Sequence, residues 1–172
     1  NKLYEVLTTH IAIQPDAVHH HENVYLFDFD NPLANNFAIA EEVSYIDELT
    51  GKHSRPDLVI YVNGIALCVI ELKRSTVSLE EGIKQNLSNE IDLIPSFFTT
   101  TQFTVAASDK NGFKYATILT PQKFWCPWKL DDHKVGVSLS DKDSFEEFFK
   151  KETFFDLFRY GVINDGGTKK VI

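Results

Sequence analysis

The clearest pattern along the chain is a pair of apolar runs that flank Asn63-Gly64. Residues Asp57–Val62 precede this dipeptide and residues Ile65–Lys73 follow it, and both runs are almost continuously apolar. An Asn-Gly pair between two apolar runs predicts a tight β-hairpin. Because the apolar residues do not alternate with polar ones, both strands are expected to be buried on both faces at the centre of a sheet. The charged residues at their outer ends therefore stand out.

The rest of the chain predicts helices and strands around this hairpin. Helical spacing of apolar residues, in two cases with a capping box, predicts helices over Lys2–Ile13, from Ser78 to Pro95 and from Ser144 onward. Strand-forming residues between turn signals predict strands at Val24–Phe29, Phe37–Ile46, Gln102–Ala107 and Tyr115–Leu119, and a hairpin around Asp165-Gly166-Gly167. This order of elements indicates an α/β fold in which helices flank a mixed central β-sheet.

Length and composition are those of one folded domain, with or without a tail. The chain has 172 residues, of which 43% are hydrophobic. Apolar runs stay far below the roughly 20 residues that span a bilayer, so we expect no membrane span. The two cysteines, Cys68 and Cys126, form no CxxC or CxxH pair. This excludes a zinc ribbon or finger, and so few cysteines fit a reducing cytoplasm.

The net charge bears on what the chain can bind alone. It is −8 at pH 7, whereas a domain that binds DNA by itself usually carries a basic excess, because phosphate contacts dominate affinity. If the substrate is DNA, neighbouring domains or subunits must hold it. The isolated chain should then bind DNA poorly.

The charged residues at the ends of the hairpin match the pattern of the PD-(D/E)xK nucleases. Pro56-Asp57 opens the first run and Glu71-Leu72-Lys73 closes the second. Hydrolysis of a phosphodiester needs charge neutralisation and an activated water, and a hard divalent cation held by carboxylates supplies both. We expect Asp57 and Glu71, with the carbonyl of Leu72, to bind Mg²⁺, or Mn²⁺ in its place. Lys73 is expected to orient the attacking water.

Such a site requires an irregularity in the hairpin. With a strict two-residue loop Val62 would face Ile65, and Glu71 would then point to the opposite face of the sheet from Asp57. The two carboxylates can share a cation only if the loop has three residues with a glycine bulge, or if one strand carries a bulge. We therefore predict an odd offset of this kind.

The short motif is weak by itself. With 25 acidic and 17 basic residues in the chain, about two (D/E)xK triplets are expected by chance. Two occur, Glu71–Lys73 and Asp132–Lys134, and the second follows no apolar strand. On the triplet alone, a strand end that emerges into solvent explains Glu71 and Lys73 as well as catalysis does.

A longer resemblance favours catalysis. Residues Ser54–Lys73 closely resemble the nuclease signature of type I restriction enzyme R subunits, and the similarity continues through Phe27–Phe37, Gly82–Asn89 and Phe97–Phe103. The resemblance implies a restriction-endonuclease-like PD-(D/E)xK core and an Mg²⁺-dependent endonuclease that cuts double-stranded DNA. It also implies methyltransferase and specificity subunits as partners.

The same resemblance implies a division of the chain. Residues 1–131 would form the nuclease domain, and residues 132–172 would connect it to a helicase motor. The sequence contains no GxxxxGK[ST] loop, so ATP would be used only by that motor, which lies outside these residues.

Three further residues are candidates for the site, and the role of a fourth, Asn89, stays open. Gln85 matches a glutamine of the family's helix motif, and Asn89 stands where many members have tyrosine. The helix wheel places Gln85 opposite an apolar stripe formed by Ile83, Leu87, Ile91 and Ile94. Gln85 therefore faces either a cleft or water. Arg55 and Lys84 are candidate contacts to DNA phosphates if they flank the cleft, and are otherwise solvated cations.

Two other functions stay open. One is a catalytically silent PD-(D/E)xK domain that serves as a docking module between motor and methyltransferase, which the acidic charge and Asn89 both allow. The weaker one is a free-standing nuclease unrelated to restriction, against which the Phe-rich C-terminal segment argues. The run His19-His20-His21 is interpreted as a solvated loop rather than a metal site.

Overall fold

A computed structural model describes residues 2–18, 20–128, 142–165 and 168–171. In this part of the chain the centre is a six-stranded sheet in the order β10-β9-β8-β7-β6-β3. Strands β7 and β8 pair in parallel and the other neighbours pair antiparallel, so the mixed central sheet of an α/β fold is confirmed. The six strands are β3 (Phe37–Glu41), β6 (Leu58–Val62), β7 (Ile65–Lys73), β8 (Phe103–Ser108), β9 (Gly112–Thr117) and β10 (Cys126–Pro127).

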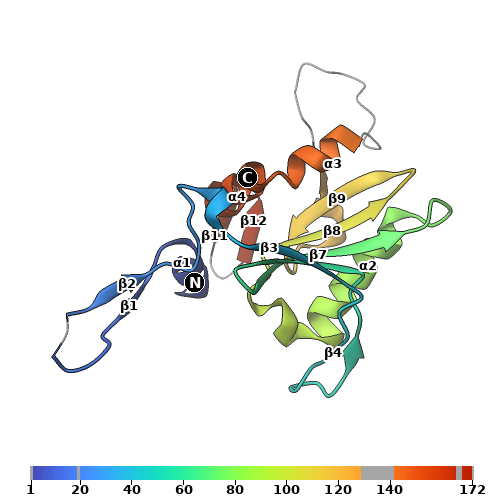
Figure 1. The fold of residues 1–172 in the computed structure, drawn as a ribbon. Helices are drawn as coiled ribbons and strands as arrows, with labels where there is room; N and C mark the ends of the chain where they lie inside the picture. Colours follow the sequence, from blue (N-terminus) through green and yellow to red (C-terminus); the bar gives the residue numbers. More distant parts are fainter. Residues whose placement is uncertain (1, 19, 129–141, 166–167, 172) are drawn as a thin grey trace.

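Helices cover both faces of this sheet (Figure 1). Helix α2 makes the crossover between the parallel strands β7 and β8 on one face, and α3 and α4 lie on the other. The helices are α1 (Lys2–Thr8), α2 (Leu79–Ser88), α3 (Lys142–Phe148) and α4 (Lys151–Tyr160), with shorter turns η1 (Pro32–Ala34), η2 (Asn89–Leu93, a π-helix), η3 (Pro95–Thr99) and η4 (Gln122–Phe124). None of the described helices combines the length and the apolar character needed to cross a membrane.

Two-stranded ribbons accompany the main sheet. They pair β1 (Ile11–Ile13) with β2 (Glu22–Val24), β4 (Tyr45–Ile46) with β5 (His53–Ser54), and β11 (Val162–Asp165) with β12 (Thr168–Val171). The last pair confirms the strands of the predicted C-terminal hairpin, whose two glycines lie outside the described residues. His19 also lies outside them, and His20 and His21 are exposed.

The predicted central hairpin is formed by β6 and β7. Its two loop residues, Asn63 and Gly64, have φ values of 50° and 81°, and positive φ at both positions is what favours Asn-Gly in a tight hairpin. The Asn63 side chain secures the turn by donating a hydrogen bond to the carbonyl of Leu26 at 2.8 Å. Every residue of β7 from Ala66 to Glu71 is buried, as the continuous apolar run predicts.

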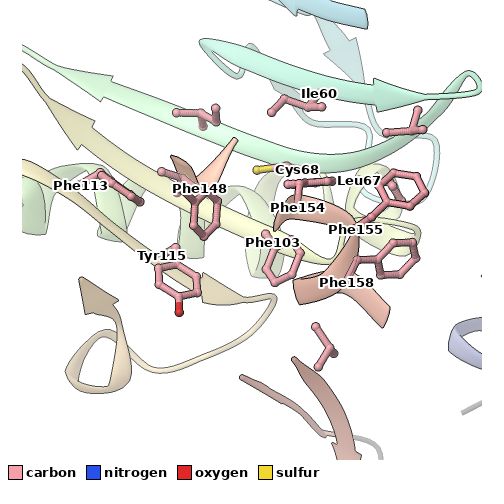
Figure 2. Packing of buried hydrophobic residues seen from close by; sticks show 14 of the residues in the cluster. Ile60, Leu67, Cys68, Phe103, Phe113, Tyr115, Phe148, Phe154, Phe155 and Phe158 are labelled. Atoms are coloured by element: carbon pink, nitrogen blue, oxygen red, sulfur yellow. The ribbon is translucent and has the colours of Figure 1, made fainter. Parts of the chain in front are cut away.

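Phenylalanine fills the face of the sheet under α3 and α4 (Figure 2). The rings of both helices pack edge-to-face on the strands, with Phe148 and Phe154 at 6.2 and 5.6 Å from Phe103 between ring centroids. The same cluster buries Phe155 and Phe158. Residues beyond 131 thus complete a core that the strands begin. The predicted division at residue 131 falls in a segment outside the described residues and stays a prediction.

Helix α2 covers the opposite face with a partly polar surface. The apolar stripe predicted for it is wrong in part, because Ile91 is 59% exposed while Ile83 and Ile94 are buried. The α-helix ends at Ser88 and continues as the π-turn η2, whose wider winding rotates the later side chains relative to an α-helix. The residues that α2 buries are Leu79, Gly82, Ile83 and Asn86.

Two predicted helix boundaries are wrong, and one predicted capping contact is absent. The helix predicted over Lys2–Ile13 ends at Thr8, and its last residues form β1 instead. Ser78 precedes α2 as predicted, but its side chain forms no capping hydrogen bond. The Phe-rich segment forms two helices, and α3 begins at Lys142, so that Ser144 is a buried helical residue rather than a cap.

Predicted strands are cut short where the chain turns. The strand predicted over Val24–Phe29 is wrong, because only Val24 lies in a strand, as the last residue of β2. The chain then bends, and the Asp28 carboxylate accepts hydrogen bonds from the backbone N–H groups of Asp30 and Asn31 at 3.1 and 2.8 Å. The strand predicted over Phe37–Ile46 divides into β3 and β4 at Glu42, which has a φ of 50°. The strand predicted over Tyr115–Leu119 is β9, which begins and ends earlier because it pairs along the whole of β8.

Candidate active site

The β6–β7 hairpin contains a bulge of the predicted kind. Next to the two-residue loop Val62 pairs with Ile65, whereas farther along Ile60 pairs with Cys68. Leu67 is the extra residue of β7. Its carbonyl accepts a hydrogen bond at 2.8 Å from the backbone N–H of Gln102, the residue that precedes β8. The odd offset therefore comes from a bulge in one strand, not from a three-residue loop.

This bulge turns the two carboxylates to one face of the sheet. The pairing of Val59 with Val69, continued by two residues, places Asp57 opposite Glu71. Both valines pack in the apolar cluster under η2 and η3, and side chains two residues apart on a strand share a face. Asp57, Glu71 and Lys73 therefore lie on the α2 side. Without the extra residue Glu71 would face the phenylalanine core.

Glu71 is a buried carboxylate beside a second one. Its side chain is 0% exposed and its Oε2 accepts no hydrogen bond. Burial, followed by the negative charge of Asp57, raises the pKa of Glu71 to about 8, while Lys73 opposes the shift. Asp57 is half-buried, and its Oδ2 accepts a hydrogen bond from the N–H of Leu72 at 2.7 Å. Two adjacent carboxylates repel each other unless a proton or a cation lies with them.

Lys73 is held beside Glu71 by α2. Its Nζ lies 3.8 Å from Glu71 Oε2 and donates a hydrogen bond to Gln85 Oε1 at 2.6 Å. The helix comes this close because residue 82 is glycine, where a Cβ would lie 3.1 Å from Ala106 Cβ and 3.3 Å from Lys73 Cγ. Gln85 thus faces Lys73 rather than open water.

These groups fit the divalent cation that the motif implies. Glu71 Oε2 is a buried acceptor without a donor, and a cation would satisfy it. The N–H of Leu72 points to Asp57, and the carbonyl of a strand residue faces the same neighbouring strand as its N–H. Within the described residues no three His, Cys, Asp or Glu side chains gather in one place. Two carboxylates and a carbonyl, completed by water and phosphate oxygens, are nevertheless a common way to hold Mg²⁺.

The chain matches a known family over most of its length. Residues 1–124 match the family described as the type I restriction enzyme R protein N terminus, which is well over half of the 172 residues. The chain belongs to this family. The resemblance drawn from the Ser54–Lys73 signature is thereby confirmed.

Two relatives are endonuclease subunits by name. The type I restriction enzyme EcoprrI endonuclease subunit of Escherichia coli is 29% identical over 160 residues, which are 88% of this chain and 49% of that protein. A Methanocaldococcus jannaschii protein that carries the name of a type I restriction enzyme MjaIXP endonuclease subunit is 29% identical over 126 residues, 71% of this chain and 12% of that protein. The chain thus spans less than half the length of either relative.

In this member of the R-protein family, Asn89 and Ser54 extend the site beyond the predicted residues. Asn89 Nδ2 donates a hydrogen bond to Glu71 Oε1 at 3.1 Å, and Ser54 Oγ donates one to Asn89 Oδ1 at 2.6 Å. The sequence left the role of Asn89 open and gave no reason to single out Ser54. The available signal was spacing, since Ser54 lies three residues before Asp57.

The two cations predicted to contact DNA phosphates are exposed, and each pairs with a carboxylate. Arg55 lies 3.2 Å from Glu42, and Lys84 lies 2.8 Å from Glu81. Surface pairs of this kind are weak, so both cations could exchange a carboxylate for a phosphate. Their role in DNA binding stays a prediction. The second triplet, Asp132–Lys134, lies outside the described residues.

Proposed function

We propose that this chain is the Mg²⁺-dependent endonuclease domain of a type I restriction enzyme R subunit and that it hydrolyses phosphodiester bonds of double-stranded DNA. Membership of the R-protein family and the names of two relatives support a nuclease of the restriction type. The observation that carries the proposal is the bulge at Leu67, which turns Asp57 and Glu71 to the same face of the sheet.

Asp57, Glu71 and the carbonyl of Leu72 would hold the cation, with Mn²⁺ able to replace Mg²⁺. When bound, it would supply positive charge for the phosphate and acidify a water molecule. Glu71 must first release its proton, because burial and Asp57 raise its pKa to about 8. Affinity for the cation should therefore increase with pH up to about 8, since proton and cation compete for one carboxylate.

Lys73 would bring a second positive charge to the reacting phosphate. Its ammonium has three N–H groups, of which one donates to Gln85 Oε1, leaving the others for water and phosphate. The side chain is 15% exposed, and charges act more strongly in a poorly solvated site. Gln85 would hold the ammonium in place while Lys73 orients the attacking water and stabilises developing charge.

The net charge of −8 supports a division of labour within a larger enzyme. We propose that an ATP-driven motor and the methyltransferase and specificity subunits hold the DNA in the cytoplasm, and that this domain cuts it. The domain by itself would bind duplex DNA weakly, because it repels phosphates overall.

The test is substitution of the site in the intact protein assembled with its partner subunits. Asp57→Ala and Lys73→Ala should each lower the cleavage rate by about 10³-fold or more, the effect of losing several kcal/mol of charge stabilisation, while ATP-driven translocation is retained. Asp30→Ala is the matched control, because its carboxylate is 96% exposed, and it should cut normally. If the Asp57 and Lys73 variants still cut, the nuclease proposal is wrong and a silent docking domain is favoured.

A further inference from the structure

One buried amide joins the two segments that carry the candidate metal ligands. Asn89 receives a hydrogen bond from Ser54 Oγ (2.6 Å) on its Oδ1 and donates one from its Nδ2 to Glu71 Oε1 (3.1 Å). Asn89 and Glu71 are both 0% exposed. Ser54 lies in β5, just before Asp57, so Asn89 connects the approach to Asp57 with the strand of Glu71.

The direction of these hydrogen bonds is fixed by the groups involved. Glu71 is ionised when it binds a cation, and an ionised carboxylate only accepts hydrogen bonds, so in that state Asn89 must turn its NH₂ group to Glu71. The amide carbonyl then faces Ser54, whose hydroxyl must donate. Removal of that hydroxyl would leave a buried carbonyl unpaired and would take away the contact that keeps the amide from turning over.

The contact occupies one oxygen of Glu71 and leaves the other open. Asn89 binds Oε1, whereas Oε2 accepts no hydrogen bond and lies 3.8 Å from Lys73 Nζ. The backbone holds Asn89 where α2 passes into the π-turn η2, and its carbonyl accepts a hydrogen bond from Ile94 N at 2.9 Å. Single π-turns of this kind often occur at functional sites.

We propose that Asn89 is a positioning residue and Ser54 its orienting partner, and that together they hold Glu71 Oε1 so that Oε2 faces the cation. This inference rests on the proposed function, because it assigns the role that these residues have toward the same metal site. Neither residue contacts the reacting atoms. Partners that orient a metal ligand are typically worth about 10–100-fold in metal affinity or activity.

The test measures Mn²⁺ binding by electron paramagnetic resonance of the intact protein without nucleotide, with the signal of Asp57→Ala subtracted to remove other sites. Asn89→Leu, which keeps the size but loses both hydrogen bonds, should weaken Mn²⁺ binding by about 10-fold or more. Ser54→Ala should weaken it less, and Ser54→Thr, which keeps the hydroxyl, should restore it. Cleavage should fall in parallel, at unchanged half-saturating DNA concentration. Asn86→Leu is the matched control, because Asn86 is a buried amide of α2 that bonds the Val105 carbonyl instead.

The double variant Ser54→Ala/Asn89→Leu should bind Mn²⁺ no more weakly than Asn89→Leu alone, because Ser54 acts only through Asn89. The inference is overturned, and the nuclease proposal left intact, if Asn89→Leu binds Mn²⁺ as tightly as the wild type does. The same holds if Asn89→Leu lowers the affinity for Mn²⁺ no more than Asn86→Leu does. Should Asn89→Leu fail to fold, Ser54→Ala decides, and unchanged Mn²⁺ affinity in it overturns the inference. Absence of any Asp57-dependent Mn²⁺ binding by the wild type contradicts both proposals.

Discussion

The two faces of the central sheet bury different kinds of side chain. The face under α3 and α4 is closed by phenylalanine rings, from Phe103 on the sheet to Phe148 and Phe158 on the helices (Figure 2). The face under α2 and η2 buries polar groups among its apolar ones, including Glu71, Asn86, Asn89 and Glu90. Strand β7 contributes to both faces, because its side chains alternate between them except at the bulge.

The apolar face contributes mainly to the stability of the fold, and the partly polar face holds the candidate catalytic groups. Apolar burial needs no particular partner and favours folding wherever rings pack. A buried polar atom costs free energy unless it is hydrogen-bonded, and under α2 and η2 Glu71 Oε2, Asn86 Oδ1 and Glu90 Oε1 accept no hydrogen bond. The phenylalanine face therefore stabilises the folded state, whereas the unpaired polar atoms of the α2 face destabilise it. The proposed site lies on the destabilising α2 face.

The largest effect on stability should come from the phenylalanine face. Phe148 contacts the rings of Phe103, Phe113 and Tyr115, and Phe148→Ala should lower the free energy of unfolding by about 3–5 kcal/mol. Denaturant unfolding of the chain measures this loss. Phe124→Ala, at a ring that is 59% exposed, should cost under about 1 kcal/mol. Equal losses for the two variants would contradict a stabilising role specific to this face.

Glu71, unlike the phenylalanine rings, is expected to lower the free energy of unfolding when no metal is bound. Its pKa in the folded protein is raised from 4.5 to about 8, so the folded protein keeps a proton that the unfolded chain has lost. The free energy of unfolding should therefore fall as the pH rises from about 4.5 to about 8. Among the described residues, Glu90, whose pKa burial raises to about 7, adds to this slope up to about pH 7, and Glu71 continues it above that pH.

Glu71→Gln should remove the upper part of this slope. At about pH 8 in EDTA the variant should be about 4 kcal/mol more stable than the wild type, and near pH 4.5 the two should differ little. Saturating Mg²⁺ should stabilise the wild type but not the variant, because a bound ligand stabilises only the state that binds it. Unfolding curves at both pH values decide. A wild type whose stability does not change between about pH 7 and 8.5 argues against a strained carboxylate.

The bulge could be predicted from the sequence because two requirements conflicted. Asn63-Gly64 favoured a two-residue loop, whereas Asp57 and Glu71 had to share a face, and only an extra residue reconciles them. Its position at Leu67 could not be predicted. The run around it is apolar on both sides of the strand, so no change of pattern marks the residue at which the alternation shifts.

The α2 face was the less predictable of the two for a related reason. Its contacts depend on where α2 gives way to a π-turn, which exposes Ile91 and turns Asn89 toward Glu71. Helical periodicity continued past Ser88 misses this change, because a π-turn is set by tertiary contacts rather than by the apolar pattern. Identifying the hydrogen-bond partners of Glu71 therefore required the structure, whereas Glu71 itself could be predicted from the sequence.

A moderate loss of cleavage is expected from a substitution at Gly82, where α2 packs against Lys73. In Gly82→Ala the new Cβ would lie 3.1 Å from Ala106 Cβ and 3.3 Å from Lys73 Cγ, so both neighbours must shift. Better helix propensity offsets the crowding, and stability should change by about 1 kcal/mol or less. Cleavage should fall by about 10-fold, because small displacements of a catalytic group are costly. Ser88→Ala on the same helix is the control, and cleavage unchanged in Gly82→Ala would show that the position of Lys73 is unimportant.

The smallest effects should come from the exposed cations. Arg55→Ala and Lys84→Ala remove side chains that are 56% and 60% exposed. Each should weaken DNA binding of the assembled enzyme by less than about threefold and lower its salt dependence by about one phosphate contact. Binding isotherms at several salt concentrations measure both quantities. A loss above tenfold for either variant would contradict this expectation, and for Lys84→Ala it would place the DNA path directly over α2.

The central claim is that the bulge at Leu67 brings Asp57 and Glu71 onto one cation on the α2 face. A crystal structure of the protein soaked with Mn²⁺, with anomalous diffraction at the manganese edge, tests it most directly. We expect one peak bonded to both carboxylates at about 2.1 Å, with the carbonyl of Leu72 among its ligands. A structure in which the two carboxylates point to opposite faces of the sheet, or in which the manganese peak touches neither, would contradict the claim.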